Sequence, residues 1–517
     1  MIYAMGAIMK IFKKYRKAIY YIFITLITML LMACDTQKEN TVTDGTDERI
    51  TIRWMIYGKK YPESEKVFAV FNEKLQQVFP GTTVEFEIVP LENYKSKWEM
   101  KMATNEALDL AWISSDYINY IGEVKKGNFM AIDYLLSSHG VELQQEIPEY
   151  LWKLETHDDN IYGVPVEGIQ YQKESSVVVS SHLLKRYGNQ DQIIQVNQGQ
   201  KYADKDSFAV FEDFLQNVND AGDIGTGVSY QTFEELANKG YEGLYGKDST
   251  FVIRIFDNKV KVYNKYELES YKAYFETMAR WYQKGFIRSD VADVLNPIQN
   301  DGKDRGSILF LAEYQNNGIG MYDFKTEYDP VIIPLQSYSY ISSSACRNSI
   351  VIPKSAENPV RAMEVLNYLL SEDGKELYRL LINGIEKEHY LVLDNQTIVH
   401  MRDNSNTYLY KLSSYTIGNV FNNYESAQGE FAEIKKQNKE ALKSPLIGFD
   451  LDTRMIAVEL EAVNLVVKEY KTALCQGISD DWEDSYIEFV AKMKEAGSDK
   501  VIKEIQKQVD AFLLEQN

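Results

Sequence analysis

Two hydrophobic periods alternate along the chain after residue 49. Residues 50–57 read I-T-I-R-W-M-I-Y, an alternating and then apolar run that predicts a β-strand ended by Gly58. Apolar residues then recur every three or four positions up to Pro80-Gly81, which predicts a helix over 64–79. The same pattern predicts strands at 83–89 and 108–113 and a helix at 94–105. Strands and helices alternating at this spacing indicate βαβ units and an α/β lobe.

The hydrophobic periodicity is less regular beyond residue 165. It predicts strands over 173–180 and 306–311 and helices over 208–218 and 271–281. Residues 190–206 are polar and predict a loop or an insertion. Asn358-Pro359 is typical of a helix start, with Asn358 as the N-cap and Pro359 at the first helical position, and an apolar face follows.

The first 33 residues differ in kind from the rest of the chain. Five basic residues between positions 10 and 17 precede the apolar run 18–31, which is the layout of an export signal. The following Leu31-Met32-Ala33-Cys34 resembles a bacterial lipoprotein signal, in which the cysteine thiol is lipidated. We therefore expect a signal peptide over 1–33, a lipid on Cys34 and a flexible polar tether over 34–49. An uncleaved membrane anchor with an incidental cysteine is the alternative, and Met9 is a second candidate for the start.

Charge narrows the range of partners to expect. The chain of 517 residues has 56 Lys and Arg against 76 Asp and Glu, a net charge of −20. Removal of the five basic residues of the signal leaves 51 against 76, a net charge near −25. Binding of nucleic acid through phosphate contacts is therefore not expected. No later stretch approaches the run of about eighteen apolar residues that a membrane-spanning helix needs.

The sequence lacks the common signatures of catalysis and metal binding. It contains no H-E-x-x-H, G-x-S-x-G or G-x-x-x-x-G-K-[ST] motif, and neither the later cysteines nor the five histidines have ligand spacing. No cofactor and no metal are expected, because Asp480-Asp481 also lacks the spacing of an EF-hand. A carboxylate pair of a glycosidase leaves no such motif, so hydrolysis stays an alternative. A bridge between Cys346 and Cys475 is left open.

Several motifs together resemble one family. The order W-M-I-Y-G-K-K, L-D-L-A-W-I-S-S-D-Y and I-Y-G-V-P, with I-P-K-S-A-E-N-P further on, is similar to the extracellular solute-binding proteins of ABC importers. The style is closest to the carbohydrate-binding branch that includes maltose-binding protein. Residues 383–390 resemble the family's G-I-E-G-K-H-Y turn, but Lys387 and Glu388 replace a Gly and a Lys, which argues against a tight turn. The chain from Gly448 onward looks like the C-terminal helical domain of a lipoprotein subset.

The resemblance implies a fold and its division into lobes. The expected fold is α/β, two-lobed and of type II, with hinge crossovers near 162–170 and 330–336. The N-terminal lobe would comprise 50–164 and 337–382. The C-terminal lobe would comprise 165–336 and 383–517, with a helical C-terminal domain from about 445.

The resemblance also implies a function. The expected protein is anchored by lipid on the extracytoplasmic face of the cell membrane, captures a carbohydrate, in particular an oligosaccharide, by lobe closure, and delivers it to an ABC transporter permease. It would act as a monomer and not as an enzyme. The alternatives are a surface-tethered glycoside hydrolase and a peptide-binding or sensor lipoprotein.

Sugar binding needs flat aromatic faces and planar hydrogen-bonding groups. Trp112 and Asp116 supply one of each across a strand end, and Asp116 follows Asp109 at the spacing seen in the maltose-binding relative. The alternative is that Trp112 is a core residue and Asp116 caps the next helix. Trp482 has two interpretations of the same kind, packing or a place at the cleft rim. Strand ends and crossovers add candidates, and the expected ligand residues are Tyr57, Lys59, Lys60, Trp112, Asp116, Gln170, Tyr171, Glu313, Tyr314, Tyr340 and Arg347.

Overall fold

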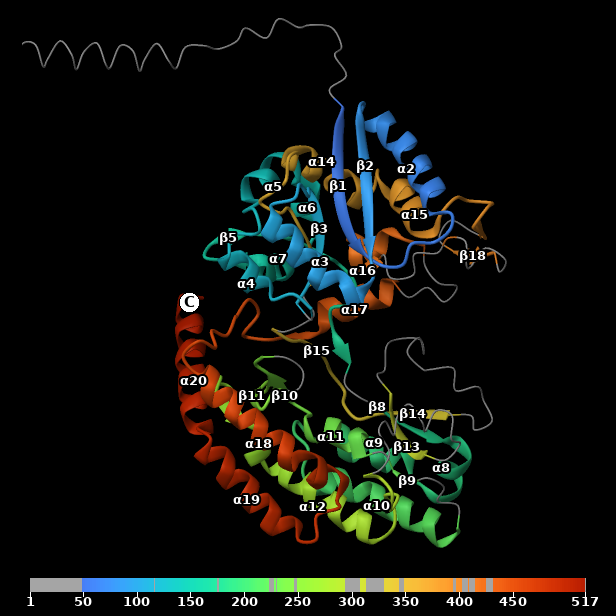
Figure 1. The fold of residues 1–517 in the computed structure, drawn as a ribbon. Helices are drawn as coiled ribbons and strands as arrows, with labels where there is room; N and C mark the ends of the chain where they lie inside the picture. The colour runs from blue at the N-terminus through green and yellow to red at the C-terminus, as the bar shows by residue number, and fades with distance from the viewer. Residues whose placement is uncertain are drawn as a thin grey trace, which may run out of the picture. The chain divides into compact units, whose positions relative to one another are not determined.

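The structure is a computed structural model of the chain. It describes residues 49–115, 117–173, 176–222, 227–228, 230–245, 249–292, 307–312, 330–343, 348–393, 397–401, 408, 414–424 and 431–516. Residues Ile50–Asn517 form one compact unit. Separate apolar clusters distinguish two lobes within this unit (Figure 1). The export signal and the tether, including Cys34, lie outside the described residues.

The first lobe is built on a five-stranded sheet. Its strands, in sheet order, are β2 (Thr82–Val89), β1 (Ile50–Tyr57), β3 (Leu110–Ser114), β16 (Asn348–Val351) and β6 (Val164–Pro165). β1 pairs in parallel with β2 and β3, whereas β16 runs antiparallel to β3 and β6. Helices α2 (Ser64–Val78) and α3 (Leu91–Thr104) connect the parallel strands. The predicted βαβ order is confirmed, and the carboxyl ends of β1, β2 and β3 meet at one edge of the sheet.

The first lobe contains more of the chain than the sequence suggested. One apolar cluster joins Ile52 of β1 to Leu366, Ile417, Ile434 and Ile447. The described residues of 383–441 therefore pack in the first lobe, whereas the sequence placed them in the second. The other elements of this lobe are α4 (Tyr120–Lys125), α5 (Asp133–His139), α6 (Val141–Glu146), α7 (Glu149–Glu155), β4 (Thr156–His157), β5 (Asn160–Ile161), α14 (Pro359–Leu370), α15 (Lys375–Asn383), β17 (Tyr390–Val392), β18 (Ile398–His400), α16 (Ser414–Ile417), η4 (Val420–Asn422) and α17 (Phe431–Glu440).

A buried carboxylate joins the start of α14 to the sheet. Asp109 is fully buried and accepts hydrogen bonds from the backbone N–H groups of Arg53 (2.9 Å), Glu357 (3.0 Å) and Asn358 (2.8 Å). The helix starts at Pro359 with Asn358 at the N-cap position, as predicted. The Asn358 side chain makes no capping hydrogen bond, because its amide donates to the carbonyl of Thr51 at 3.3 Å. Asp109 takes over part of the capping role from outside the helix.

The turn after α15 forms despite its unusual residues. Lys387 adopts a left-handed backbone conformation, with φ 68°, and its N–H donates to the carbonyl of Tyr390 at 2.7 Å. The buried His389 accepts the N–H of Ile385 at Nδ1 (2.9 Å), and its Nε2 lies 2.9 Å from Glu63 Oε2. These contacts stabilise the turn. The prediction that Lys387 and Glu388 disfavour a tight turn here was therefore wrong.

Replacing Lys387 by glycine should stabilise the protein. A non-glycine residue pays a steric cost in the left-handed region, and glycine relieves it against a smaller loss of chain entropy. We expect the free energy of unfolding to rise by about 0.5 kcal/mol. Urea denaturation measures this change, and Lys387→Ala, which keeps the steric cost, is the control that should show no gain.

The second lobe contains two sheets with helices packed around them. The first has the order β14 (Pro330–Pro334), β8 (Ser176–Ser180), β13 (Ser307–Ala312) and β9 (Gly227–Val228), and the second has the order β10 (Tyr241–Gly243), β11 (Phe251–Arg254) and β12 (Val262–Asn264). The other elements are α8 (Ser181–Tyr187), α9 (Gln190–Gln198), α10 (Lys205–Asp220), α11 (Tyr230–Ala237), η1 (Lys265–Glu267) and α12 (Glu269–Gln283). The predicted strands and helices of this lobe are confirmed within a few residues of their expected ends.

The predicted loop at 190–206 is only partly right. Helix α9 fills its first half, because the Asn189 side chain caps the helix by accepting the Gln192 N–H at 3.1 Å. Ile193 anchors the helix, with 2% of its surface exposed. One buried isoleucine in a polar stretch is too weak a periodic signal to reveal this helix in the sequence.

Three long helices end the chain and belong to the core of the second lobe. They are α18 (Ala457–Gln476), α19 (Trp482–Glu495) and α20 (Ser498–Glu515); α18 and α19 lie beside α12, and α20 packs against α18 and α19 (Figure 1). Val463, Phe489 and Val501 are buried in the same cluster as Trp281. Trp482 is partly buried against that cluster, which supports its packing interpretation. The Cys475 thiol is free and buried, whereas Cys346 lies outside the described residues.

Within the described residues, no helix has both the length and the apolar character needed to cross a membrane.

Candidate functional site

Three short strands link the two lobes. They are β19 (Leu442–Lys443), β15 (Ser339–Ile341) and β7 (Gln172–Lys173), in that sheet order, with β15 parallel to β19 and antiparallel to β7. The residues before and after β19 belong to different apolar clusters. Ala441 belongs to the cluster of the first lobe, and Leu446 belongs to that of the second. The sequence predicted two crossovers, and β19 adds a third. We call β7, β15 and β19 the hinge sheet.

Asn438 of α17 fixes the first crossover. Its Oδ1 accepts the N–H groups of Gln170 (3.0 Å) and Tyr171 (3.2 Å), and its Nδ2 donates to the carbonyl of Gly168 at 2.7 Å. Asn438 is buried, with 7% exposed. Its amide satisfies three backbone groups of a segment that belongs to no regular element, and so gives that segment one defined path.

Glu242 of β10 joins the second lobe to the hinge sheet. Its carboxylate is buried, with 3% exposed, and accepts hydrogen bonds from Tyr340 Oη, from the N–H (2.6 Å) and Oγ of Ser343, and from Ser444 Oγ (2.7 Å). Burial and the neighbouring Glu242 carboxylate raise the pKa of Tyr340 well above its ordinary value. Four donors therefore bond to one buried carboxylate, and this hydrogen-bond network, which we call the polar joint, connects β10 to the hinge sheet.

An aromatic group gathers at the carboxyl ends of β1 and β3. Trp112 is 3% exposed, and its ring centroid lies 5.3 Å from those of Tyr57 and Tyr94 and 6.3 Å from that of Tyr117. Tyr94 Oη donates to the carbonyls of Met55 (3.1 Å) and Trp112 (2.7 Å), which ties the group to the sheet. Tyr117 is 44% exposed and Tyr57 is half-buried. We call Tyr57, Trp112 and Tyr117 the aromatic platform.

The platform also carries a carboxylate at its edge. Burial raises the pKa of Tyr57, and the nearby Tyr117 and Glu92 raise it further. Glu92 stands in the first turn of α3, directly after the carboxyl end of β2. Aromatic faces from two strand ends and an acceptor group from a third therefore share one edge of the sheet. Such a set can hold a ring by stacking and accept hydrogen bonds from its hydroxyl groups.

The structure brings together some of the expected ligand residues and separates others. Tyr57 and Trp112 are in the platform, while Gln170, Tyr171 and Tyr340 are in the hinge region with their backbone or hydroxyl groups engaged. Lys60 is ion-paired with Glu65, and Lys59 lies over the Tyr61 ring, 5.8 Å from its centroid. The other expected ligand residues lie outside the described residues: Asp116, Glu313, Tyr314 and Arg347.

Two residues of this region were missed in the sequence. Tyr117 lies in the candidate ligand loop 114–117 after the third strand but was not among the expected ligand residues. Glu242 and Asn438 gave no signal, because each acts on backbone or side chains at least 98 residues away. No described group of three or more His, Cys, Asp or Glu side chains is placed to hold a metal ion.

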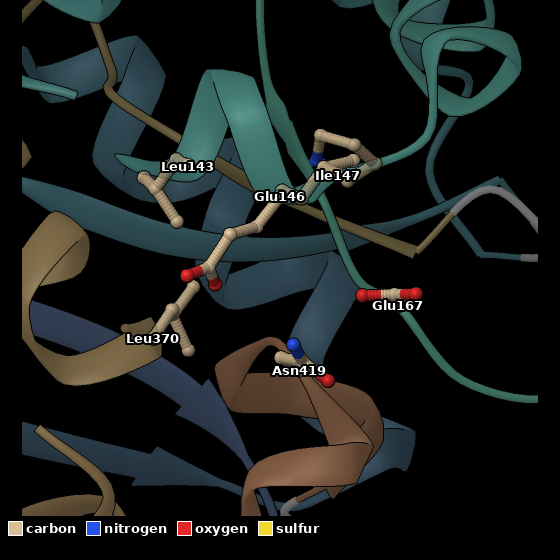
Figure 2. Close-up of a pocket in the computed structure, with 7 residues that line it drawn as sticks. Leu143, Glu146, Ile147, Glu167, Leu370 and Asn419 are labelled. Atoms are coloured by element: carbon tan, nitrogen blue, oxygen red, sulfur yellow. The ribbon is translucent and has the colours of Figure 1, made fainter. Parts of the chain in front are cut away.

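A small cavity lies beside the first crossover (Figure 2). Its volume of ≈ 10 Å³ is about the space that one water molecule needs, so it is no sugar site. Glu146 of α6 and Glu167 of the crossover both line it, and Asn419 faces them. Burial raises the pKa of Glu167 to about 7, with Lys435 opposing the shift and Glu146 adding to it. Burial also raises the pKa of Glu146.

Comparisons with known proteins agree with this architecture. Residues 445–514 match a family model described as a domain of unknown function (DUF3502). A carbohydrate ABC transporter substrate-binding protein of Streptococcus pneumoniae serotype 4 (strain ATCC BAA-334 / TIGR4) is 24% identical over 98% of this chain and 99% of its own length. The solved N-glycan transport solute binding protein (NgtS) from Streptococcus pneumoniae is 20% identical, with a TM-score of 0.71 over 90% of this chain and 100% of that chain.

A second solved structure is more distant in sequence. It is an HMO binding ABC-transporter associated solute binding protein from Bifidobacterium longum infantis ATCC 15697, 12% identical, with a TM-score of 0.62 over 90% of this chain and 99% of that chain. The resemblance inferred from the sequence is confirmed for the fold: the chain has the two-lobed type II fold of the solute-binding proteins that serve ABC importers.

Proposed function

We propose that this protein captures a carbohydrate, in particular an oligosaccharide, by lobe closure and delivers it to an ABC transporter permease. The observation that carries the proposal is the similarity over almost the whole chain to a carbohydrate ABC transporter substrate-binding protein. The solved relatives are an N-glycan transport protein and an HMO binding protein. A hinge sheet between two α/β lobes supplies the movement that capture needs.

The aromatic platform is the part of the first lobe that we propose contacts the ligand. Trp112 is enclosed by its tyrosine neighbours, so it positions them and does not itself offer a free face. Tyr57 and Tyr117 are more exposed and can stack against a pyranose ring. Glu92 and the expected residue Asp116 would accept hydrogen bonds from sugar hydroxyls. Ligand bound here would favour the closed form through contacts that only that form completes.

Location and assembly extend the same proposal. Substrate-binding proteins of ABC importers work outside the cytoplasm, and the sequence before residue 34 has the layout of an export signal. We propose that the protein is anchored by a lipid on Cys34, with 34–49 as the tether, and that it works as a monomer. Two or more acyl chains would hold it stably to the membrane. Substrate-binding relatives are transport proteins and not enzymes, which favours binding over hydrolysis.

A thermal-shift screen of the body, residues 35–517, tests the function. Neutral and acidic glycans are compared with short peptides. A ligand at a hundred times its dissociation constant should stabilise the protein by about 2.7 kcal/mol. Stabilisation by peptides alone would mean that the ligand is a peptide and not a carbohydrate. Release of shortened glycans during incubation would favour a hydrolase.

Replacing Tyr117 by alanine should weaken binding of the stabilising glycan more than tenfold, about 1.4 kcal/mol or more. The loss follows from removing an exposed stacking face, and the unliganded melting temperature should stay nearly unchanged because Tyr117 is 44% exposed. Calorimetric titration measures the affinity. The matched control is Tyr134→Ala on α5, where the side chain is 72% exposed and lies outside the platform. Equal losses in both variants would remove Tyr117 from the site.

A further inference from the structure

The side chain of Arg254, the last residue of β11, has no hydrogen-bond or ion-pair partner among the described residues. Its guanidinium carbon lies 4.9 Å from the ring centroid of Tyr202 and 5.2 Å from that of Tyr263. Its Nε is buried without a hydrogen-bond acceptor, and no described residue forms an ion pair with it. A guanidinium with a buried N–H left unpaired is costly, and such a group in a native fold calls for a ligand, an ion or water.

The nearby carboxylate is engaged elsewhere. Asp257 follows Arg254 by three residues, but its oxygens accept the hydroxyls of Tyr202 (3.0 Å) and Tyr263 (3.5 Å). It therefore orients the two rings that lie beside the guanidinium. The Nε–H of the guanidinium is left for another acceptor.

The surroundings of Arg254 are positive in an otherwise acidic chain. Lys201 lies 5.4 Å from the Phe256 ring centroid, and Lys261 lies 5.2 Å from that of Tyr263; both lysines are exposed. Lys201 and Lys261 thus lie over rings next to Arg254, although the whole chain carries a net charge of −20. This local excess favours an anionic ligand.

Flat apolar faces adjoin the cations. Tyr202 and Tyr241 stack with ring centroids 5.3 Å apart and planes 21° apart, and both are half-buried. Phe256 packs edge-on against Tyr338, 4.8 Å between centroids, and Tyr338 directly precedes β15 of the hinge sheet. The cluster thus offers what a sugar ring needs beside what a carboxylate needs.

We propose that Arg254, with Tyr202 and Tyr263 beside its guanidinium, binds the carboxylate of an acidic saccharide such as a uronate or a sialoside. That the carboxylate belongs to a saccharide rests on the proposed carbohydrate capture. The guanidinium edge receives the carboxylate in a charge-assisted, bidentate arrangement, and the adjoining rings contact the sugar. The site selects acidic over neutral glycans and is distinct from the platform of the first lobe.

Calorimetric titration of the body, residues 35–517, with matched sugars tests the inference. The pairs are 3′-sialyllactose against lactose and cellobiouronic acid against cellobiose, with inorganic phosphate as the free anion. We expect at least one acidic member to bind ten or more times more tightly than its neutral partner. Arg254→Gln should remove that preference, and Arg254→Lys should retain only part of it because a lysine lacks the planar fork.

Arg186→Gln is the matched control, since Arg186 of the same lobe also lies over a tyrosine, 5.0 Å from the Tyr187 ring centroid. It should leave the preference intact. Equal binding of acidic and neutral sugars, or a preference that survives in Arg254→Gln, overturns the inference. Phosphate binding as tight as the acidic sugar assigns the site to free anions and also overturns it. The proposed function is judged separately, because it fails if no glycan of the thermal screen binds or if the glycans are shortened during incubation.

Discussion

Replacing Glu242 by alanine should lower the free energy of unfolding by about 3–5 kcal/mol. The carboxylate accepts hydrogen bonds from Tyr340, Ser343 and Ser444, and the variant leaves these donors without an acceptor in a place that water does not reach. Because the Glu242 side chain of β10 bonds to β15 and to the segment after β19, the loss falls on the junction between the second lobe and the hinge sheet. Urea denaturation followed by tryptophan fluorescence measures it.

Two further variants sharpen this test. Glu242→Gln keeps the shape and one acceptor oxygen, so it should lose less than the alanine variant but still lose stability, because its amide N–H groups face other donors. Glu276→Ala is the control: it removes a carboxylate of the same lobe that is 52% exposed and paired with Arg280 at 3.6 Å, and should change the free energy of unfolding by less than about 0.5 kcal/mol. A Glu242→Ala variant as stable as this control would show that the joint contributes nothing.

The elements of the first sheet could be predicted because their signals are local. Residues 50–57 alternate and then turn apolar, and α2 repeats its apolar positions until Pro80-Gly81 stops it. Parallel pairing of β1 with β2 and β3 follows from the helices between them. The lobe assignment of 383–441 failed for the opposite reason. Ile417 and Ile434 are separated by polar stretches and carry no period that says which lobe they pack in.

The candidate site divides in the same way. The place of Tyr57 at the end of β1 and of Trp112 in β3 could be predicted, because strand ends of a parallel sheet mark ligand sites. The choice between a ligand residue and a core residue for Trp112 could not be made, since its enclosure depends on Tyr94 of α3 and on Tyr117 beyond the strand; the structure supports the core interpretation. The Arg254 cluster could not be predicted from the sequence for a further reason. Its tyrosines come from three separate segments, and a single arginine in a strand carries no motif.

The Glu167 carboxyl should make the protein less stable as the pH rises from about 4.5 to about 7. Its folded-state pKa of about 7 lies above the ordinary value of 4.5, so the folded protein holds the proton more tightly than the unfolded chain does. The stability contributed by this group is fully present below pH 4.5 and is lost as the pH passes through 7. Since the side chain is half-buried, the effect is on the order of 2 kcal/mol. Lys435 and Glu146 face the same carboxylate, and Glu372, Lys375 and Glu142 act on Glu146 in turn.

Replacing Glu167 by glutamine should therefore raise the free energy of unfolding at pH 8 by that amount and leave it unchanged near pH 4.5. The amide keeps the shape of the protonated acid beside the cavity of Figure 2 but cannot ionise. Urea denaturation at several pH values gives the difference curve. Glu149→Gln on α7 removes the same charge from a side chain that is 86% exposed, so its difference from the wild type should vary little with pH. A difference curve of Glu167→Gln as flat as that control would mean that this carboxyl titrates alike in the folded and unfolded protein. If the stability difference between Glu167→Gln and the wild type rises with pH, a proton-sensitive group lies directly on the first crossover. The Glu167 carbonyl also accepts the Val420 N–H there, at 2.8 Å. Ligand affinity would then be predicted to change over the same range of pH.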